Sequence, residues 1–136
     1  MSMWGGNMKF NRLIPELSVS NLKKSLDFYL ILGFTIKYER LEDSLVFLEL
    51  DGCQLMIQED NNVWDVGVLS YPRGNGINIS MEVSNIDLLV LKLNSINYPL
   101  FRNIKESPYR VNDKVYVDRE FLVQDPDGYL LRFVQE

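Results

Sequence analysis

A four-residue sequence occurs twice in the chain, and this repeat constrains the fold more than any other feature. Val19-Ser20-Asn21-Leu22 returns in the second half as Val83-Ser84-Asn85-Ile86. At both places an apolar strand pattern changes to helical spacing, with Ser or Asn at the helix N-cap. The repeat therefore predicts an internal duplication, although shared capping chemistry could also produce four matching residues.

The strand and helix patterns of the two halves agree with this duplication. In the first half, Pro15 marks an edge position or a bend within the first strand, and Gly33 is placed to end the helix. Tight turns are expected at Asp51-Gly52 and at Asp125-Pro-Asp-Gly128. The predicted strands are 12–19, 34–40, 44–50, 54–58, 77–83, 98–103, 115–124 and 129–134, and the predicted helices are 22–33 and 86–93.

Each half is thus a βαβββ unit, and the predicted class is α+β, with two tandem βαβββ modules forming half-open curved mixed sheets. One domain is expected at 9–136, with modules 9–60 and 76–136 joined by the loop 61–75. Residues 1–8 are expected to be a frayed or non-native terminus. Each module has too few strands to close a sheet, so strand edges remain unpaired. We therefore expect a homodimer.

The composition excludes several classes of function. The chain has no histidine, which rules out Ser-His and Cys-His triads and the common zinc and iron sites. Its single cysteine, Cys53, excludes an internal disulfide and is expected to be a buried thiol. A net charge of -5 with no basic run argues against nucleic acid as a partner. No apolar run suits a membrane span or signal peptide, so we expect no membrane partner and a cytoplasmic location.

Motifs at both ends of the chain resemble a known superfamily. They are Leu13-Ile-Pro-Glu-Leu-Ser-Val-Ser-Asn-Leu22, Ser25-Leu-Asp-Phe-Tyr29, Leu32-Gly-Phe34, Arg119-Glu-Phe121, Asp125-Pro-Asp-Gly128 and Leu131-Arg-Phe133. In this order and spacing, residues 9–136 resemble the vicinal oxygen chelate superfamily of glyoxalases, extradiol dioxygenases, and fosfomycin- and bleomycin-resistance proteins. The Pro15 strand and Arg119-Glu-Phe121 make the chain most similar to the bleomycin-resistance proteins.

The resemblance implies where metal ligands would lie. Those positions are Ile14, Asn78 and Arg132, with a less certain fourth near Gln58. Isoleucine has no donor atom, an amide is a weak ligand for transition metals, and a guanidinium repels cations. We therefore expect no bound metal and no cofactor.

Arg132 has two readings. It could clamp an anionic ligand, or it could form an ion pair with a neighbour such as Glu16 or Glu120. Paired arginines are common on sheets, so the ion pair is the preferred interpretation.

Without a metal, the function that the resemblance implies is reversible binding rather than an enzyme's turnover. The bleomycin-resistance proteins bind a bulky cationic aromatic glycopeptide between two subunits. We therefore expect a protein that sequesters a bleomycin-like antibiotic or a similar small molecule. The alternatives are a superfamily enzyme without a protein-bound metal, using Glu16, Glu49 or Glu120 as general base, and a scaffold for another protein.

Aromatic side chains and one carboxylate are the candidate ligand contacts, because aromatic faces stack on flat rings and attract cations. Phe47 has a core position as its alternative, Trp64 and Tyr109 have loop packing, and Glu82 has a solvent-facing strand position. Ser80 and Glu82 stand where bleomycin-resistance proteins tend to carry tryptophans, which argues against bleomycin itself. The candidates are Phe47, Trp64, Tyr71, Glu82, Tyr109 and Tyr116.

Overall fold

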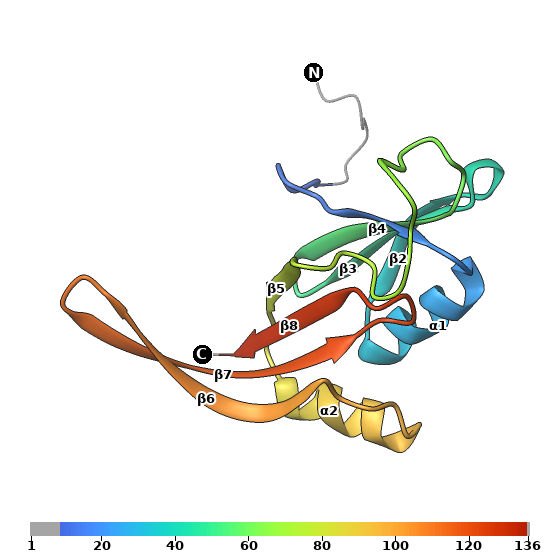
Figure 1. Ribbon diagram of the computed structural model, residues 1–136. Helices are drawn as coiled ribbons and strands as arrows, with labels where there is room; N and C mark the ends of the chain where they lie inside the picture. Colours follow the sequence, from blue (N-terminus) through green and yellow to red (C-terminus); the bar gives the residue numbers. More distant parts are fainter. Residues whose placement is uncertain (1–8, 136) are drawn as a thin grey trace.

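The computed structural model describes residues 9–135, which form two four-stranded mixed sheets and two α-helices (Figure 1). The expectation for residues 1–8 lies outside the described residues. The first module contains β1 (Glu16–Val19), α1 (Leu22–Leu32), β2 (Thr35–Arg40), a 3-10 turn (Leu41–Asp43), β3 (Leu45–Leu50) and β4 (Cys53–Glu59). The second contains β5 (Asn78–Glu82), α2 (Ile86–Ser95), β6 (Arg102–Val111), β7 (Lys114–Gln124) and β8 (Leu130–Gln135).

The two sheets have the same topology, which confirms the predicted α+β class and the two βαβββ modules. The strand order is β1-β4-β3-β2 in the first sheet and β5-β8-β7-β6 in the second. In each sheet the first strand of the module pairs parallel to the last, and the other pairs are antiparallel. The first strand of each module therefore lies at an edge. The predicted strand 12–19 is wrong for its first half, because β1 begins at Glu16 and Pro15 lies just before it.

Local capping sets where the helices begin and end. The side chain of Asn21 accepts a hydrogen bond from the Lys24 amide, and that of Asn85 accepts one from the Leu88 amide. Gly33 ends α1 with φ 108°, a left-handed conformation that a side chain would strain. Of the two capping candidates that the repeat offered, Asn is the cap in both modules.

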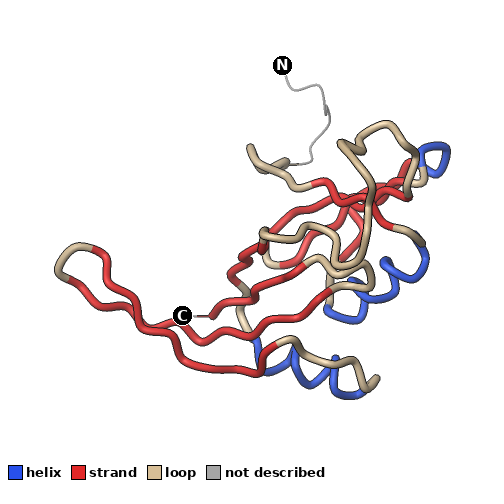
Figure 2. The backbone as a smooth tube through the Cα atoms, in the orientation of Figure 1, coloured by secondary structure: helices blue, strands red, loops and turns tan. Residues whose placement is uncertain are grey.

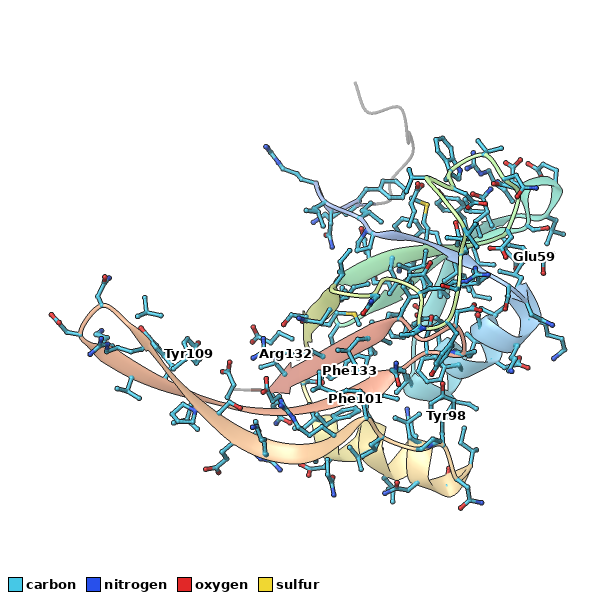
Figure 3. All side chains as sticks on the ribbon, viewed as in Figure 1. Glu59, Tyr98, Phe101, Tyr109, Arg132 and Phe133 are labelled. Carbon is cyan, nitrogen blue, oxygen red and sulfur yellow. The ribbon has the colours of Figure 1, made fainter. Side chains whose placement is uncertain are left out.

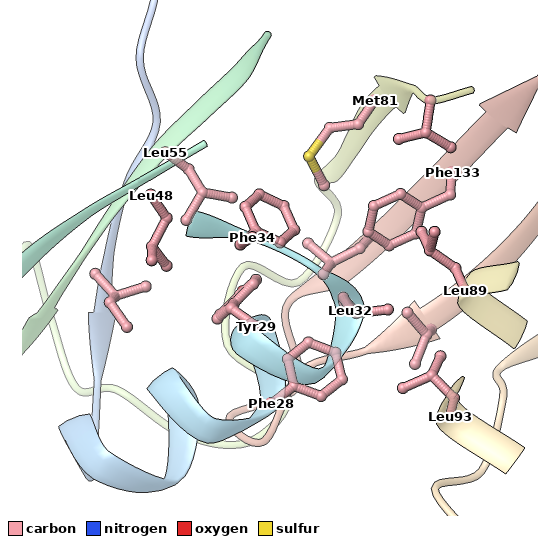
Figure 4. Close-up of a cluster of buried hydrophobic side chains, with 14 of the residues drawn as sticks. Phe28, Tyr29, Leu32, Phe34, Leu48, Leu55, Met81, Leu89, Leu93 and Phe133 are labelled. Atoms are coloured by element: carbon pink, nitrogen blue, oxygen red, sulfur yellow. The ribbon is translucent and has the colours of Figure 1, made fainter. Parts of the chain in front are cut away.

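The two modules share a single hydrophobic core, shown in Figure 4. Both helices contribute, with Tyr29 and Leu32 from α1 and Leu93 from α2 fully buried. Each helix covers one face of its own sheet and also contacts the other helix. Apolar side chains from both halves are therefore removed from water together in one cluster.

Polar contacts also cross between the modules, and they follow the sequence repeat. The amide and hydroxyl of Ser20 donate to the carboxylate of Asp127 at 3.0 and 2.6 Å. The amide and hydroxyl of Ser84 donate to Asp51 at 2.8 and 3.0 Å. The Asp-Gly turn of each module therefore binds the start of the other module's helix.

The predicted strand 98–103 is wrong for its first half, because residues 98–101 form a loop and β6 runs from Arg102 to Val111. β6 and β7 form a long hairpin whose far end extends away from the body as an arm (Figures 1 and 2). Residues 104–111 lack the alternation of a half-buried strand, since the end of the arm has no third strand beside it. Within residues 9–135, no helix is long and apolar enough to span a membrane.

Candidate ligand-binding face of the second sheet

The faces of the two sheets that the helices leave uncovered differ in character. In the first sheet, Phe10 and Ile14 pack on an apolar cluster. Its buried members are Leu45, Phe47 and Met56. The N-terminal segment thus covers this part of the first sheet.

The uncovered face of the second sheet has a hollow of about 200 Å³. Strand alternation directs Ser80 and Glu82 of β5 to the same face, and the register pairs Ser80 with Arg132 of β8. Figure 3 labels Arg132, which lies at the base of the arm, and Tyr109, which lies along the arm. The lining residues are Ser80, Glu82, Tyr109, Asp118, Arg132 and Val134.

Glu120 forms an ionic network with Arg102 and with Arg132 of the hollow. It is only 3% exposed and accepts hydrogen bonds from Arg102 Nη2 and Ser107 Oγ at 2.8 Å, and from Arg132 Nε. Burial opposes ionisation, but the bonds from Ser107 and Arg132 together with both arginines hold the pKa of Glu120 below its usual value. The preferred ion-pair interpretation of Arg132 is confirmed, with Glu120 as its partner.

Two further carboxylates of the hollow lack such partners. Neither Glu82 nor Asp118 forms an ion pair with any residue between 9 and 135. Beside them, the ring of Tyr109 stacks on that of Tyr116, with centroids 5.5 Å apart and planes inclined by 22°. The hollow therefore combines negative charge available to a ligand with an aromatic surface.

The six candidate residues from the sequence do not all lie together. Glu82 and Tyr109 line the hollow, and Tyr116 stacks on Tyr109. Phe47 is 0% exposed and stacks on Tyr38 in the covered face of the first sheet. Trp64 and Tyr71, on the 61–75 loop, lie outside this hollow. They are 64% and 66% exposed. Trp64 donates to Gln58 Oε1, while Tyr71 lines a separate hollow beside α1.

Asp118 is the lining residue that sequence reasoning missed. It lies two residues before Glu120 on β7, so both side chains share a face, and its register partner is Ser107. The alternation of β7 could have placed Asp118 on the same face as Glu120. Its proximity to Glu82 depends on the pairing of β7 through β8 to β5, which the sequence does not specify.

The residues at the implied metal positions do not fit a metal ion. Ile14 packs in the apolar cluster, and Arg132 is bonded to Glu120. The Gln58 amide donates to the Asp43 carbonyl and accepts from Trp64. In the described part of the chain, no group of three or more His, Cys, Asp or Glu side chains could hold a metal. A guanidinium at one of these positions would also repel a cation, so the residues present do not fit a bound metal ion.

Cys53 is half-buried rather than fully buried as expected, and its thiol donates to the carbonyl oxygen of Glu82 at 3.5 Å. Burial raises the pKa of this thiol. Because the thiolate is the nucleophile, Cys53 is disfavoured as a reactive group.

Comparison with known proteins identifies the fold. No family model matches the chain, and no curated protein matches it. A glyoxalase/bleomycin resistance protein/dioxygenase from Alicyclobacillus acidocaldarius has a TM-score of 0.62 and 20% identity, over 92% of this chain and 90% of that chain. The chain has the fold of this superfamily.

Two further solved structures are similar. TioX from Micromonospora sp. ML1 has a TM-score of 0.68 and 16% identity, over 93% of this chain and 96% of that chain. A superfamily member from Vibrio splendidus 12B01 is 31% identical over 90% of this chain and 97% of that chain. Its TM-score is only 0.42, so the fold assignment rests on the other two.

Proposed function

We propose that the protein is a bleomycin-resistance-like member of the superfamily that binds and sequesters a cationic aromatic small molecule on the open face of the second sheet. The observation that carries this proposal is the hollow in which Glu82 and Asp118, without ion-pair partners in the described chain, lie beside Tyr109. A ligand cation would gain Coulomb attraction to both carboxylates, and a flat ring could stack on the tyrosine.

The size of the hollow limits how much of a ligand it can hold. Its volume of about 200 Å³ is below the roughly 300–1,000 Å³ of typical ligand pockets. It suits one ring and its charged substituents. A bulky antibiotic would extend over the neighbouring arm, where Val111, Val115 and Val117 are exposed.

A homodimer is part of this proposal. Among the described strands, β1, β2, β5 and β6 are edges with one neighbour each. The exposed apolar side chains of the arm also favour association with a second copy, which could enlarge the pocket. Sedimentation equilibrium on the full chain would test this, and a monomer at micromolar concentration would contradict it.

Binding is favoured over turnover by the state of two of the three carboxylates that were candidate general bases. Glu120 already accepts three hydrogen bonds from Arg102, Ser107 and Arg132. A hydrogen bond from Gln54, helped by Lys37, holds the pKa of Glu49 below its usual value against burial. A carboxylate with a lowered pKa is a weaker base, so an enzyme acting without a protein-bound metal is the less favoured alternative.

The test is isothermal titration of the protein with a panel of cationic aromatic antibiotics, metal-free bleomycin among them. We expect saturable binding of at least one of them, weakened at least tenfold in the double variant Glu82→Gln/Asp118→Asn and in Tyr109→Ala. Glu42→Gln and Trp64→Ala are matched controls, since both residues are outside the hollow, and they should bind normally. If bleomycin and other cationic aromatic antibiotics give no saturable heat, sequestration of this ligand class is wrong.

A further inference from the structure

We infer that the ligand of this face has a zwitterionic end, with an anionic group bound by Arg132 and a cationic group bound by Glu82 and Asp118. This inference rests on the proposed function and specifies its ligand class. It follows from one hollow that contains two carboxylates and a guanidinium with hydrogen-bond donors still available.

Arg132 retains most of its hydrogen-bonding capacity. Its Nε donates to Glu120, which orients the guanidinium, and neither Nη atom has a hydrogen-bond partner in the range 9–135. The side chain is 34% exposed and lines the hollow. A guanidinium fork held in this way is suited to two parallel bonds with a carboxylate.

The charges around Arg132 also favour an anionic group. Two guanidinium groups, those of Arg102 and Arg132, share a single carboxylate, that of Glu120. The network therefore has one positive charge in excess, while Glu82 and Asp118 contribute two negative charges that it does not neutralise. A purely cationic ligand would be repelled by Arg132, whereas a zwitterion satisfies both parts of the hollow.

The sheet register sets a suitable separation between the two charged groups. Ser80 pairs with Arg132, so Glu82, two residues further along β5, is a diagonal neighbour of Arg132 on the same face. In a parallel pair, strands about 4.8 Å apart with a rise of about 3.3 Å per residue place such neighbours about 8 Å apart. An ammonium one or two carbon atoms from a carboxylate, as in an α-amino acid, could contact both side chains. With Tyr109 beside them, an aromatic amino-acid-like end is the best match.

Three probes of similar size separate the contributions: phenylalanine has both charges, 2-phenylethylamine only the cation, and 3-phenylpropionate only the anion. Binding would be followed by NMR chemical-shift titration, because such fragments bind weakly. We expect phenylalanine to bind at least tenfold more tightly than either other probe.

The variant Arg132→Lys keeps a positive charge near Glu120 but removes the fork. We expect it to reduce phenylalanine affinity to that of 2-phenylethylamine and to leave 2-phenylethylamine affinity unchanged. Arg110→Lys, at an exposed position of the arm outside the hollow, is the matched control and should have no effect. If Arg132→Lys does not fold, the three-probe comparison on the unmodified protein still decides the question.

The outcomes separate this inference from the proposed function. If 2-phenylethylamine binds as tightly as phenylalanine, or bleomycin binds and phenylalanine does not, the zwitterionic ligand is wrong and sequestration of a cation stands. If neither the probes nor the antibiotics bind, both proposals are wrong.

Discussion

The hydroxyl of Tyr29 in α1 donates a 2.8 Å hydrogen bond to the carboxylate of Asp125 in the turn between β7 and β8. The other carboxylate oxygen accepts from the amides of Asp127 and Tyr129, both at 3.0 Å. Burial nevertheless dominates and raises the pKa of Asp125 from 3.8 to about 6. This junction between the modules is therefore most stable when Asp125 is protonated.

The raised pKa of Asp125 predicts a pH effect on stability. The native state binds more protons than the unfolded state between about pH 4 and 6, so this contribution is present at low pH and is lost as pH rises through 6. From pH 4.5 to 7, the free energy of unfolding should fall on the order of 2 kcal/mol further in the unmodified protein than in Asp125→Asn. Urea unfolding at both pH values measures the difference.

The other carboxylates with shifted pKa values affect stability outside the pH range from 4.5 to 7. The pKa values of Glu49, Asp87 and Glu120 are lowered, so their contributions are lost only below about pH 4.5. Asp87→Asn is the control, and its pH dependence between 4.5 and 7 should match that of the unmodified protein. Identical pH dependence in Asp125→Asn would contradict the prediction.

The crossed Ser-Asp contacts predict unequal losses of stability. Asp127 is buried and also lies 3.9 Å from the guanidinium of Arg73, whereas Asp51 is exposed. We expect Asp127→Ala to cost about 2–3 kcal/mol and Asp51→Ala about 1 kcal/mol, because only the first removes a buried carboxylate and its charge beside the mostly buried guanidinium of Arg73. Denaturant unfolding of both variants tests the order, and equal losses would refute it.

Removing the buried carboxylate of Glu120 should be destabilising. Glu120→Ala leaves the guanidinium groups of Arg102 and Arg132 without their shared partner, but both are partly exposed to water, so the cost should be about 1–3 kcal/mol. Glu106→Ala, at an exposed position of β6, should change stability by less than about 0.5 kcal/mol. Thermal unfolding monitored by circular dichroism compares the two, and a loss below about 1 kcal/mol for Glu120→Ala would argue against the network.

Truncation of Phe47 should cost much more stability than truncation of Trp64. Phe47→Ala removes a fully buried ring from the aromatic cluster with Phe10 and Tyr38, and should cost about 3–5 kcal/mol. Trp64→Ala affects a side chain that is mostly exposed, so the loss should stay below about 1 kcal/mol. Unfolding midpoints measure both, and a large loss in Trp64→Ala would indicate packing of the 61–75 loop.

The helices and tight turns could be predicted from the sequence because their signals are local. Asn21 and Asn85 cap helices within three residues of themselves, and Asp51-Gly52 adopts the left-handed conformations of a tight turn. The start of β6 could not be predicted, because Tyr98 is fixed by a distant contact, its hydroxyl donating to the Gln124 carbonyl.

The candidate site was predictable only in part. The Arg132–Glu120 pair followed from both residues lying on strands of one module. The sequence did not indicate which aromatic side chains face the open sheet, because Phe10 covers Phe47 from a segment more than thirty residues away in sequence. Asp118 was missed for a similar reason, since the hollow gathers residues from four strands.

Ser20 and Ser84 each bond to a turn of the other module, and this arrangement bears on how such a chain could arise. A module alone would keep a helix start without its acceptor and an aspartate turn without its donors. Two separate copies could satisfy both by associating, so each half behaves physically as one subunit of a two-subunit assembly. The 61–75 segment joins these subunits and raises their effective concentration, which makes the assembly independent of protein concentration.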